Sequence, residues 1–261
     1  MFCNRHLLIA AGSHTRRRSP GIHGALLALA TTLTLLRGDA SAQARHFPLE
    51  STAGLQLVNA TAEPVTLDGK KGLRAKEVPA QTSAQAQAQR TTGESLIVIE
   101  GLEFANGVIE AEIAGAPAPG APETARGFVG IAFRLQKDMR TFEQLYLRPT
   151  NGRSDDQERR NHAVQYSSHP DWPFFRTRKE TPSKYEAYVD LVAGAWTKVR
   201  IEVRDAQARL YVHDQKLPTL IVNDLKMGGQ AKGAVALTPG VNSIAHFRNV
   251  TITPAPGGDA R

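Results

Sequence analysis

The sequence predicts an all-β fold, an antiparallel sandwich of two sheets. Apolar and polar residues alternate repeatedly between residues 95 and 252, which is the pattern of half-buried strands. Turn-forming residues separate the alternating runs, and the connections between most of them are too short for crossover helices. No segment of a dozen residues keeps the three-four apolar spacing of a helix. These three observations together favour antiparallel strands.

The N-terminal segment, residues 1–44, has the order of an export signal. Basic residues at 16–18 precede a short apolar run at 24–36, and small residues follow at 40–44. The apolar run is shorter than the roughly 20 residues that cross a bilayer. We therefore expect cleavage after Ala42 or Ala44 and no stable membrane insertion afterwards. The mature protein should then be periplasmic or extracellular.

Charge and cysteine content limit the chemistry of the mature chain. The full chain has 32 basic and 25 acidic residues; residues 1–44 hold five arginines and one aspartate, so 27 basic and 24 acidic residues remain, a net charge of +3. This mild charge argues against nucleic acid as a partner. The single cysteine, Cys3, lies inside the expected signal, so the mature chain can form no disulfide and no thiolate metal site.

The expected domain covers residues 45–254, followed by a disordered tail at 255–261. Its predicted strands are residues 95–100, 107–113, 128–135, 142–148, 185–191, 197–204, 209–213, 234–237 and 245–252. Residues 79–90 predict a short helix or a polar loop, and the Pro- and Gly-rich residues 114–122 predict a projecting loop.

Four sequence segments carry a family resemblance. They are GFVGIAFR at 127–134, FEQLYLRP at 142–149, GAWTKVRI at 194–201 and ARLYV at 208–212, with FRNV at 247–250 in the position of the last strand. The chain resembles the concanavalin A-like lectin and glucanase superfamily, in the branch of laminin-G-like and 3-keto-disaccharide hydrolase-like domains of secreted bacterial proteins. The resemblance implies a jelly-roll sandwich. It specifies function less well, because the superfamily includes enzymes, lectins and adhesive modules.

One departure from this superfamily excludes a mechanism. Its laminarinase-type members carry Glu-x-Asp-x-x-Glu on one strand, which places carboxylates about 5 Å apart for a retaining reaction. The nearest run here is residues 186–190, with two carboxylates on one face and no third. We therefore reject the laminarinase mechanism.

Polar and aromatic residues gather between residues 146 and 188, beyond what packing requires. Strand alternation places Gln144, Tyr146 and Arg148 on one face of their strand, and Glu186 with Tyr188 on one face of another. If both strands share a sheet, these groups meet on its open face, where the resemblance implies ligand binding. Aromatic rings and Arg or carboxylate forks are the groups that a saccharide needs. The candidate ligand-binding residues are Tyr146, Arg148, Asn151, Arg160, Gln165, Tyr166, Trp172, Arg178 and Tyr188.

The long connection at 151–184 should be ordered, because residues 162–167 can alternate as a strand and Trp172 with two phenylalanines can anchor it. We expect it to cover the open sheet face and form one wall of the site. The alternative is that its arginines pair with neighbouring carboxylates and that Trp172 covers an edge. A catalytic reading makes His162 a general base with Asp156 or Glu143 as its orienting or acidic partner.

Three functional classes follow from these observations. The first is an exported, carbohydrate-interacting sandwich that binds a glycan or glycoside on its concave sheet face. The second is a glycoside hydrolase that uses the same cleft, and the third is an adhesive or scaffolding module without catalytic activity. Phosphate-binding loops and nucleophile elbows are absent from the sequence, so no cofactor is expected. No metal site is predicted, although a structural calcium ion near Asp155 and Asp156 is left open.

Overall fold

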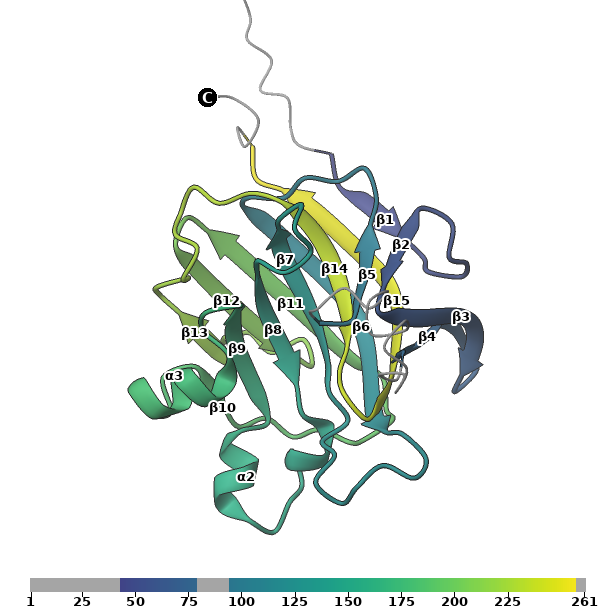
Figure 1. Ribbon diagram of the computed structural model, residues 1–261, viewed down its shortest axis with the longest axis vertical. Helices are drawn as coiled ribbons and strands as arrows, with labels where there is room; N and C mark the ends of the chain where they lie inside the picture. The colour runs from purple at the N-terminus through teal and green to yellow at the C-terminus, as the bar shows by residue number, and fades with distance from the viewer. Residues whose placement is uncertain (1–42, 79–93, 257–261) are drawn as a thin grey trace, which may run out of the picture. The chain divides into compact units, whose positions relative to one another are not determined.

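The computed structural model describes residues 43–78 and 94–256, which form two antiparallel sheets (Figure 1). The expected signal up to residue 42, the segment 79–90 and the tail from residue 257 lie outside the described residues. The predicted all-β sandwich is confirmed. Short helical segments follow the strands at one edge of the second sheet: η1 Pro149–Asn151, α2 Gln157–Asn161 and α3 Phe174–Glu180.

Sheet A has eight strands within the described part of the chain. Its order is β13-β12-β11-β6-β15-β4-β3, with β1 beside β15. The bounds are β1 Arg45–Phe47, β3 Ala60–Leu67, β4 Lys70–Glu77, β6 Gly107–Pro117, β11 Thr197–Arg204, β12 Gln207–Val212, β13 Leu220–Val222 and β15 Ser243–Pro254.

Sheet B has seven strands among residues 43–78 and 94–256, in the order β10-β9-β8-β7-β14-β5-β2. The bounds are β2 Leu55–Val58, β5 Leu96–Ile99, β7 Val129–Leu135, β8 Phe142–Leu147, β9 Val164–His169, β10 Glu186–Ala187 and β14 Ala234–Pro239.

The main core lies between the two sheets and follows from strand alternation. Ile109 and Ile201 of sheet A pack in one buried cluster with Ile131 and Leu145 of sheet B. Because successive side chains of a strand point to opposite faces, the residues between these core positions must face outward. On sheet B this outward face is itself largely buried around Phe142, where a second apolar cluster forms. The outward face of sheet B is therefore partly covered.

The prediction missed the N-terminal strands β1 to β4. The strands β3 and β4 are rich in charged and exposed residues, so the apolar alternation that revealed later strands is weak there. A different signal was present: Asp68 and Gly69 join them with φ angles of 49° and 71°, as a two-residue hairpin turn requires. An Asp-Gly pair between two extended runs could have identified this hairpin.

Two predicted boundaries were wrong. The strand β6 continues to Pro117, where a projecting loop was expected from residue 114, because residues 114–117 pair with β15. The expected strand at 185–191 is reduced to the two residues of β10, which pair with Val164 and Gln165 of β9. Its alternation persists, since Val189 and Leu191 stay buried while Tyr188 is exposed.

A fully buried arginine, Arg134 at the end of β7, connects sheet B to three loops. Its guanidinium donates to the carbonyl oxygens of Ala105, Gly228 and Asp205 at 2.9, 2.7 and 2.7 Å. It also donates to Oδ1 of Asn106 at 3.1 Å. Buried carbonyl groups need such donors, because an unpaired one retains its desolvation penalty.

Replacing this arginine tests how far those hydrogen bonds stabilise the sandwich. We expect Arg134→Met to lower the free energy of unfolding by about 3–5 kcal/mol, because several buried acceptors lose their donor at once. The exposed Arg209 on sheet A is the matched control, and Arg209→Met should change stability by less than about 0.5 kcal/mol. Urea denaturation followed by tryptophan fluorescence measures both, and equal stability of the two variants would contradict the assignment.

Candidate functional site

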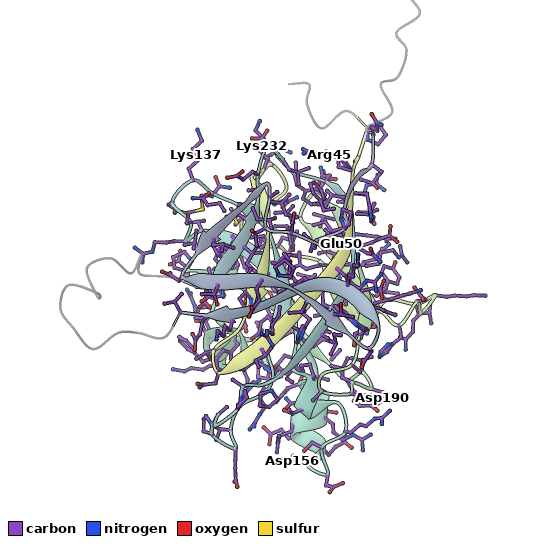
Figure 2. The ribbon with its side chains drawn as sticks, turned by 90° about the vertical axis from the view of Figure 1, so that its right-hand side faces the viewer. Arg45, Glu50, Lys137, Asp156, Asp190 and Lys232 are labelled. Atoms are coloured by element: carbon purple, nitrogen blue, oxygen red, sulfur yellow. The ribbon has the colours of Figure 1, made fainter. Side chains whose placement is uncertain are left out.

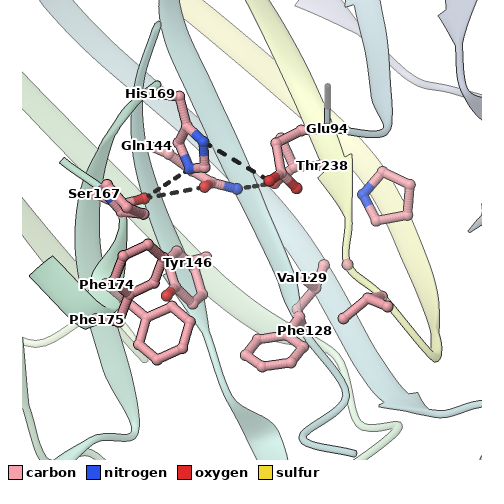
Figure 3. Close-up of a pocket in the computed structure, with 14 residues that line it drawn as sticks. Glu94, Phe128, Val129, Gln144, Tyr146, Ser167, His169, Phe174, Phe175 and Thr238 are labelled. Carbon is pink, nitrogen blue, oxygen red and sulfur yellow. Dashed lines mark hydrogen bonds and ion pairs between the residues drawn. The ribbon is translucent and has the colours of Figure 1, made fainter. Parts of the chain in front are cut away.

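A pocket of about 280 Å³ lies on the outward face of sheet B (Figure 3). Phe128 and Tyr146 form one apolar side, and Phe174 and Phe175 of α3 form another. Polar side chains of β8, β9 and β14 lie beside these aromatic rings, on the side of the pocket nearest Glu94 (Figure 3). The pocket thus combines aromatic walls with a polar floor.

The register of the strands places the floor residues side by side. Gln144 of β8 lies opposite Ser167 of β9, and the next outward pair along these strands is Tyr146 and Gln165. Gly130 of β7 pairs with Tyr146, and a Cβ at Gly130 would lie 2.5 Å from the Cβ of Tyr146. Only glycine therefore permits this packing of the Tyr146 wall against β7.

The floor is a chain of hydrogen bonds between side chains from three strands. Nε2 of Gln144 donates to Oγ1 of Thr238 at 2.8 Å, and Oγ of Ser167 donates to Oε1 of Gln144 at 3.3 Å. Ser167 Oγ also lies 3.3 Å from Nε2 of His169, whose Nδ1 is 3.7 Å from Oε1 of Glu94. This row therefore contains both hydrogen-bond donors and hydrogen-bond acceptors, which are the groups that the hydroxyls of a ligand would need.

The surroundings of His169 favour the neutral form of its imidazole. Burial lowers the pKa of its imidazole, and the negative charge of Glu94 opposes this shift without reversing it. Its ring stacks on Phe142 with centroids 4.6 Å apart and planes inclined by 15°. A neutral imidazole has one donor and one acceptor nitrogen, so His169 can both donate and accept a hydrogen bond in the pocket floor.

The α3 wall is apolar and accessible. Phe174 and Phe175 are 41% and 65% exposed, and their rings meet edge to face at 5.8 Å. Isolated exposed apolar residues are common on proteins, but here two adjacent rings face a pocket. This part of the connection at 151–184 therefore lines the pocket, and its role as a wall of a ligand site stays a prediction.

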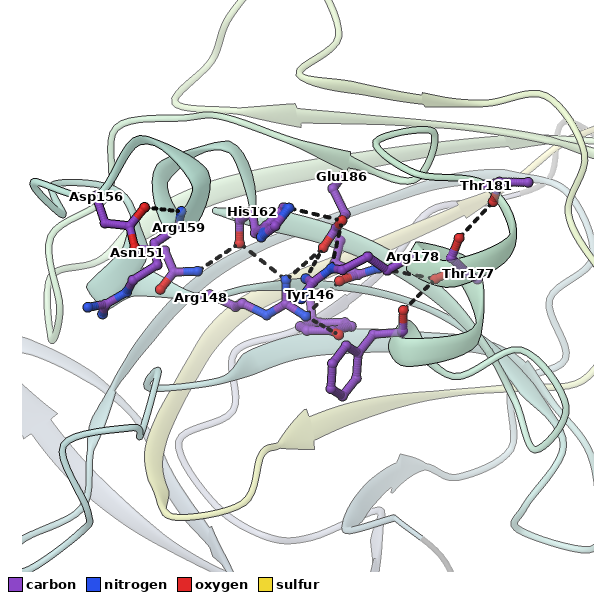
Figure 4. Close-up of polar contacts among 12 residues, drawn as sticks. Tyr146, Arg148, Asn151, Asp156, Arg159, His162, Thr177, Arg178, Thr181 and Glu186 are labelled. Carbon is purple, nitrogen blue, oxygen red and sulfur yellow. Dashed lines mark hydrogen bonds and ion pairs between the residues drawn. The ribbon is translucent and has the colours of Figure 1, made fainter.

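Beside the pocket, the buried side chain of Arg148 joins β8 to β9, β10 and α3 (Figure 4). Its guanidinium donates to Oε1 of Glu186 at 3.1 Å, to Oε1 of Gln165 at 2.6 Å and to the hydroxyl of Tyr146 at 3.1 Å. Arg178 of α3 donates to both carboxylate oxygens of Glu186. We call these five residues the Arg148 network.

His162 adjoins this network, and its pKa is also lowered. Its Nε2 lies 3.3 Å from Oε2 of Glu186, and its carbonyl oxygen accepts from Nη1 of Arg148 at 3.3 Å. Burial lowers the pKa of His162; the charge of Glu186 raises it, and the charges of Arg178 and Arg148 lower it further. Asn151 donates to the same carbonyl at 3.1 Å. These contacts hold the chain after α2 against the sheet.

The candidate ligand-binding residues separate into groups. Tyr146 lines the pocket, whereas Arg148, Gln165, Arg178 and Asn151 lie beside it and are largely committed to contacts within the protein. Two other candidates, Arg160 and Tyr188, contact each other, with Nη2 of Arg160 3.2 Å from the tyrosine hydroxyl.

Two candidates lie away from the pocket. Tyr166 is on the core face of sheet B, where its hydroxyl donates to Glu143 at 2.5 Å. Trp172 lies between the cations of Arg176 and Lys226, 3.9 and 4.4 Å from its ring centroid. This agrees with the alternative that Trp172 covers an edge. We exclude both residues from the site.

The three candidate catalytic residues do not share a cleft. Glu143 points into the core, accepts from the backbone N–H of Met227 at 2.8 Å, and has a pKa raised by burial. Asp156 caps α2 by accepting from the backbone N–H groups of Glu158 and Arg159. His162 lies on the outward side of sheet B. A sheet therefore separates His162 from Glu143, so these two residues cannot act as an acid and base pair on one substrate.

Sequence reasoning missed several pocket residues: Glu94, Phe128, Ser167, His169, Phe175 and Thr238. The alternation that identified Gln165 also applies to Ser167 and His169, which share its face of β9. Continuing that period by two steps would have found them. Phe128, Glu94 and Thr238 come from elements far apart in the sequence, and no local pattern joins them.

A second hollow, of about 270 Å³, lies on the outward face of sheet A near Tyr211. Its charged groups pair among themselves: Lys198 with Asp214 at 2.8 Å, and Glu112 with Lys70 at 3.2 Å. Aromatic walls of the kind formed by α3 do not face it. The pocket on sheet B is therefore the better candidate site.

Across 43–78 and 94–256, no group of three or more His, Cys, Asp or Glu side chains could hold a metal ion. The side chain of Asp156, considered above for calcium, caps α2 instead. No helix in the part of the chain that the structure describes is long and apolar enough to cross a membrane.

The ion pair between Arg148 and Glu186 can be tested by removing the carboxylate charge. We expect Glu186→Gln to lower the free energy of unfolding by about 3–5 kcal/mol, because Arg148 would stay buried without its counter-charge. The control is Glu180→Gln, which removes an exposed pair with Arg176 and should cost less than about 1 kcal/mol. If chemical denaturation shows similar losses for the two variants, the network does not hold this edge together.

Comparisons with known proteins show the fold. No protein-family model matches the sequence, and no curated protein matches it. The carbohydrate-binding module CBM66 from Bacillus subtilis has a TM-score of 0.50 and 14% identity, over 76% of this chain and 95% of that chain. A Bacillus subtilis protein of unknown function with a galectin-like fold has a TM-score of 0.49 and 12% identity, over 81% and 96%. The galectin LEC-6 from Caenorhabditis elegans has a TM-score of 0.38 and 12% identity, over 61% and 89%. The likeness to the carbohydrate-binding module shows that the described residues have an antiparallel β-sandwich fold.

Proposed function

We propose that this protein is an exported carbohydrate-binding protein that holds a saccharide in the pocket on the outward face of sheet B. The observation that carries the proposal is the composition of that pocket. Four aromatic rings line one part of it, and a row of hydrogen-bonded side chains lines the adjoining part. Its volume of about 280 Å³ suits one or two sugar rings and leaves longer chains to extend beyond it.

The chemistry of a sugar matches both parts of the pocket. The C–H faces of a pyranose ring are apolar and pack against flat aromatic rings such as Phe175 and Tyr146. Its hydroxyl groups donate and accept, as do Gln144, Ser167 and His169 on the floor. The likeness in fold to a carbohydrate-binding module is consistent with this proposal.

The proposal is binding without cleavage. Hydrolysis of a glycoside requires an acid and a second carboxylate or base on either side of the scissile bond. Glu143 lies behind sheet B and Asp156 caps a helix, so neither can act with His162 on one substrate. No observation among the described residues favours the hydrolase over the binding protein.

Removing one aromatic wall should weaken saccharide binding without affecting folding. We expect Phe175→Ala to lower affinity about tenfold, or about 1.4 kcal/mol, because the ring contacts the ligand and is 65% exposed in its absence. A glycan array would identify a ligand, and isothermal titration calorimetry would measure its affinity for each variant.

The matched control is Leu217→Ala, which removes a side chain that is 79% exposed and lies next to β13 of sheet A. It should bind the same saccharide as tightly as the parent protein. Equal affinity of the Phe175 variant and the parent would contradict the pocket assignment. Failure of every saccharide to bind would leave the adhesive or scaffolding role as the better hypothesis.

Export from the cytoplasm can be tested separately from saccharide binding. The first strand, β1, begins at Arg45, directly after the second expected cleavage site, so cleavage there would remove no strand. We expect the mature protein, recovered from outside the cytoplasm, to begin at Gln43 or Arg45. N-terminal sequencing or intact mass spectrometry measures this. A protein that keeps residues 1–42 in the cytoplasmic fraction would disprove export.

A further inference from the structure

The charge that a ligand meets in the pocket on sheet B depends on the residues that line it. The expected mature chain has a net charge of only +3. Figure 2 shows charged side chains over the whole length of the molecule, from Lys232 at the top through Glu50 to Asp156 at the bottom. A preference for charged or uncharged ligands therefore comes from the pocket itself.

Among the described residues that line the pocket, only Glu94 carries a full charge, and that charge is negative. The other lining side chains are apolar, aromatic or uncharged polar groups, and the surroundings of His169 favour its neutral form. Glu94 lies at the polar end of the pocket, near His169 and Thr238 (Figure 3). Its side chain is 51% exposed, so a ligand in the pocket has access to the carboxylate.

The protein compensates this negative charge only weakly. In the described part of the chain, the one ion pair of Glu94 is with His169, whose Nδ1 lies 3.7 Å from Oε1 of the carboxylate. That distance is longer than a hydrogen bond, and burial disfavours the charged imidazole. No lysine or arginine is among the described residues that line the pocket. A cation carried by a ligand would therefore find an accessible counter-charge here.

The aromatic end of the pocket already holds cations. The guanidinium carbon of Arg148 lies 5.8, 5.2 and 5.3 Å from the ring centroids of Phe128, Tyr146 and Phe174. The Phe174 ring also faces the guanidinium of Arg178, at 5.5 Å. Both guanidinium groups repel a further cation that approaches these rings. The rings are therefore suited to an uncharged face of the ligand, and a cationic group belongs at the polar end.

An amino sugar matches this division of the pocket. The C–H faces of its ring are apolar, and its protonated amine is a cation with three hydrogen-bond donors. One pocket of about 280 Å³ contains both the aromatic rings and Glu94, so a sugar ring packed against Phe175 or Tyr146 directs substituents toward the polar end. Thr238 and Ser167 place hydroxyl oxygens beside the carboxylate at that end.

We propose that Glu94 binds a protonated amine and that the saccharide held in the pocket is an amino sugar. The second clause rests on the proposed function, whereas the first depends only on Glu94 and the charges around it. Acetylation of the amine removes its positive charge and should remove the preference. A carboxylate or sulfate group on the saccharide would be repelled by Glu94.

Titration followed by two-dimensional NMR of the protein tests the preference and measures weak affinities. The probes are the methyl glycosides of glucose, galactose and mannose, each as the parent sugar, as its 2-amino and 6-amino derivatives and as the N-acetylated forms of both. At about pH 6.5 such amines are protonated. At least one amino sugar should bind threefold or more tightly than both its parent and its N-acetylated form, as expected for an exposed ion pair.

Replacing the carboxylate by an amide of the same shape tests the role of Glu94. Glu94→Gln should bring the ratio of affinities for the amino sugar and its parent close to one, with little change for the parent sugar. The matched control is Glu110→Gln, which removes an exposed carboxylate from sheet A and should keep the preference. Both variants should unfold at the temperature of the unmodified protein. An unchanged preference in Glu94→Gln would overturn the assignment of the amine to this residue.

Salt provides a second measurement that needs no substitution. Raising the ionic strength from about 20 mM to about 500 mM should weaken binding of the amino sugar and leave binding of its neutral parent unchanged, because an exposed ion pair is screened. Equal salt dependence of the two affinities would contradict an ion pair with Glu94.

A ring amine without hydroxyl groups, cyclohexylamine, separates the amine site from the saccharide pocket. Binding of cyclohexylamine that depends on Glu94, with no binding of any saccharide, would support the amine site and overturn an amino sugar as its ligand. Saccharide binding with every amino sugar less than threefold preferred would overturn the inference and leave the saccharide pocket standing. If neither cyclohexylamine nor any saccharide binds, both proposals fail.

Discussion

The ion pair between Arg148 and Glu186 is the interaction on which the site depends. Both side chains are almost fully buried, with 5% and 3% of their surfaces exposed, so each is stable there only while the other is present. The pair joins β8 to β10, and Arg178 extends it to α3. Since α3 carries Phe174 and Phe175, the position of one pocket wall follows from this buried charge.

The two faces of sheet B have different surroundings: one packs against the core, and the other lines the pocket. Alternate residues of β8 and β9 face the core, as Leu145 and Tyr166 do, and the residues between them face the pocket. A charged residue on the core side needs its own partners, and Glu143 obtains them from Tyr166 and the backbone of Met227. The polar residues of these strands therefore have different roles: those facing inward stabilise the sandwich, and those facing outward belong to the pocket or to the Arg148 network.

Part of the candidate site followed from local pattern. Alternation placed Tyr146 and Arg148 on the outward face correctly, because that period depends only on strand geometry. Alternation could not show that Arg148 would form an ion pair with Glu186, since the two residues are 38 positions apart. Glu143 and Tyr166 were predicted as site residues although both face the core, because residue type was given more weight than the face of the strand on which each lies.

The sequence by itself determined the sandwich and most strands from residue 95 onward, because these features arise from short-range periodicity. The export signal stays a prediction from the order of residues 1–44. It did not reveal the β3–β4 hairpin, whose alternation is masked by charged residues. Only the tertiary structure decided that α3 lies beside sheet B and that Glu94 meets His169. Such pairings depend on which distant segments the folded chain brings together, and neither spacing nor composition encodes that proximity.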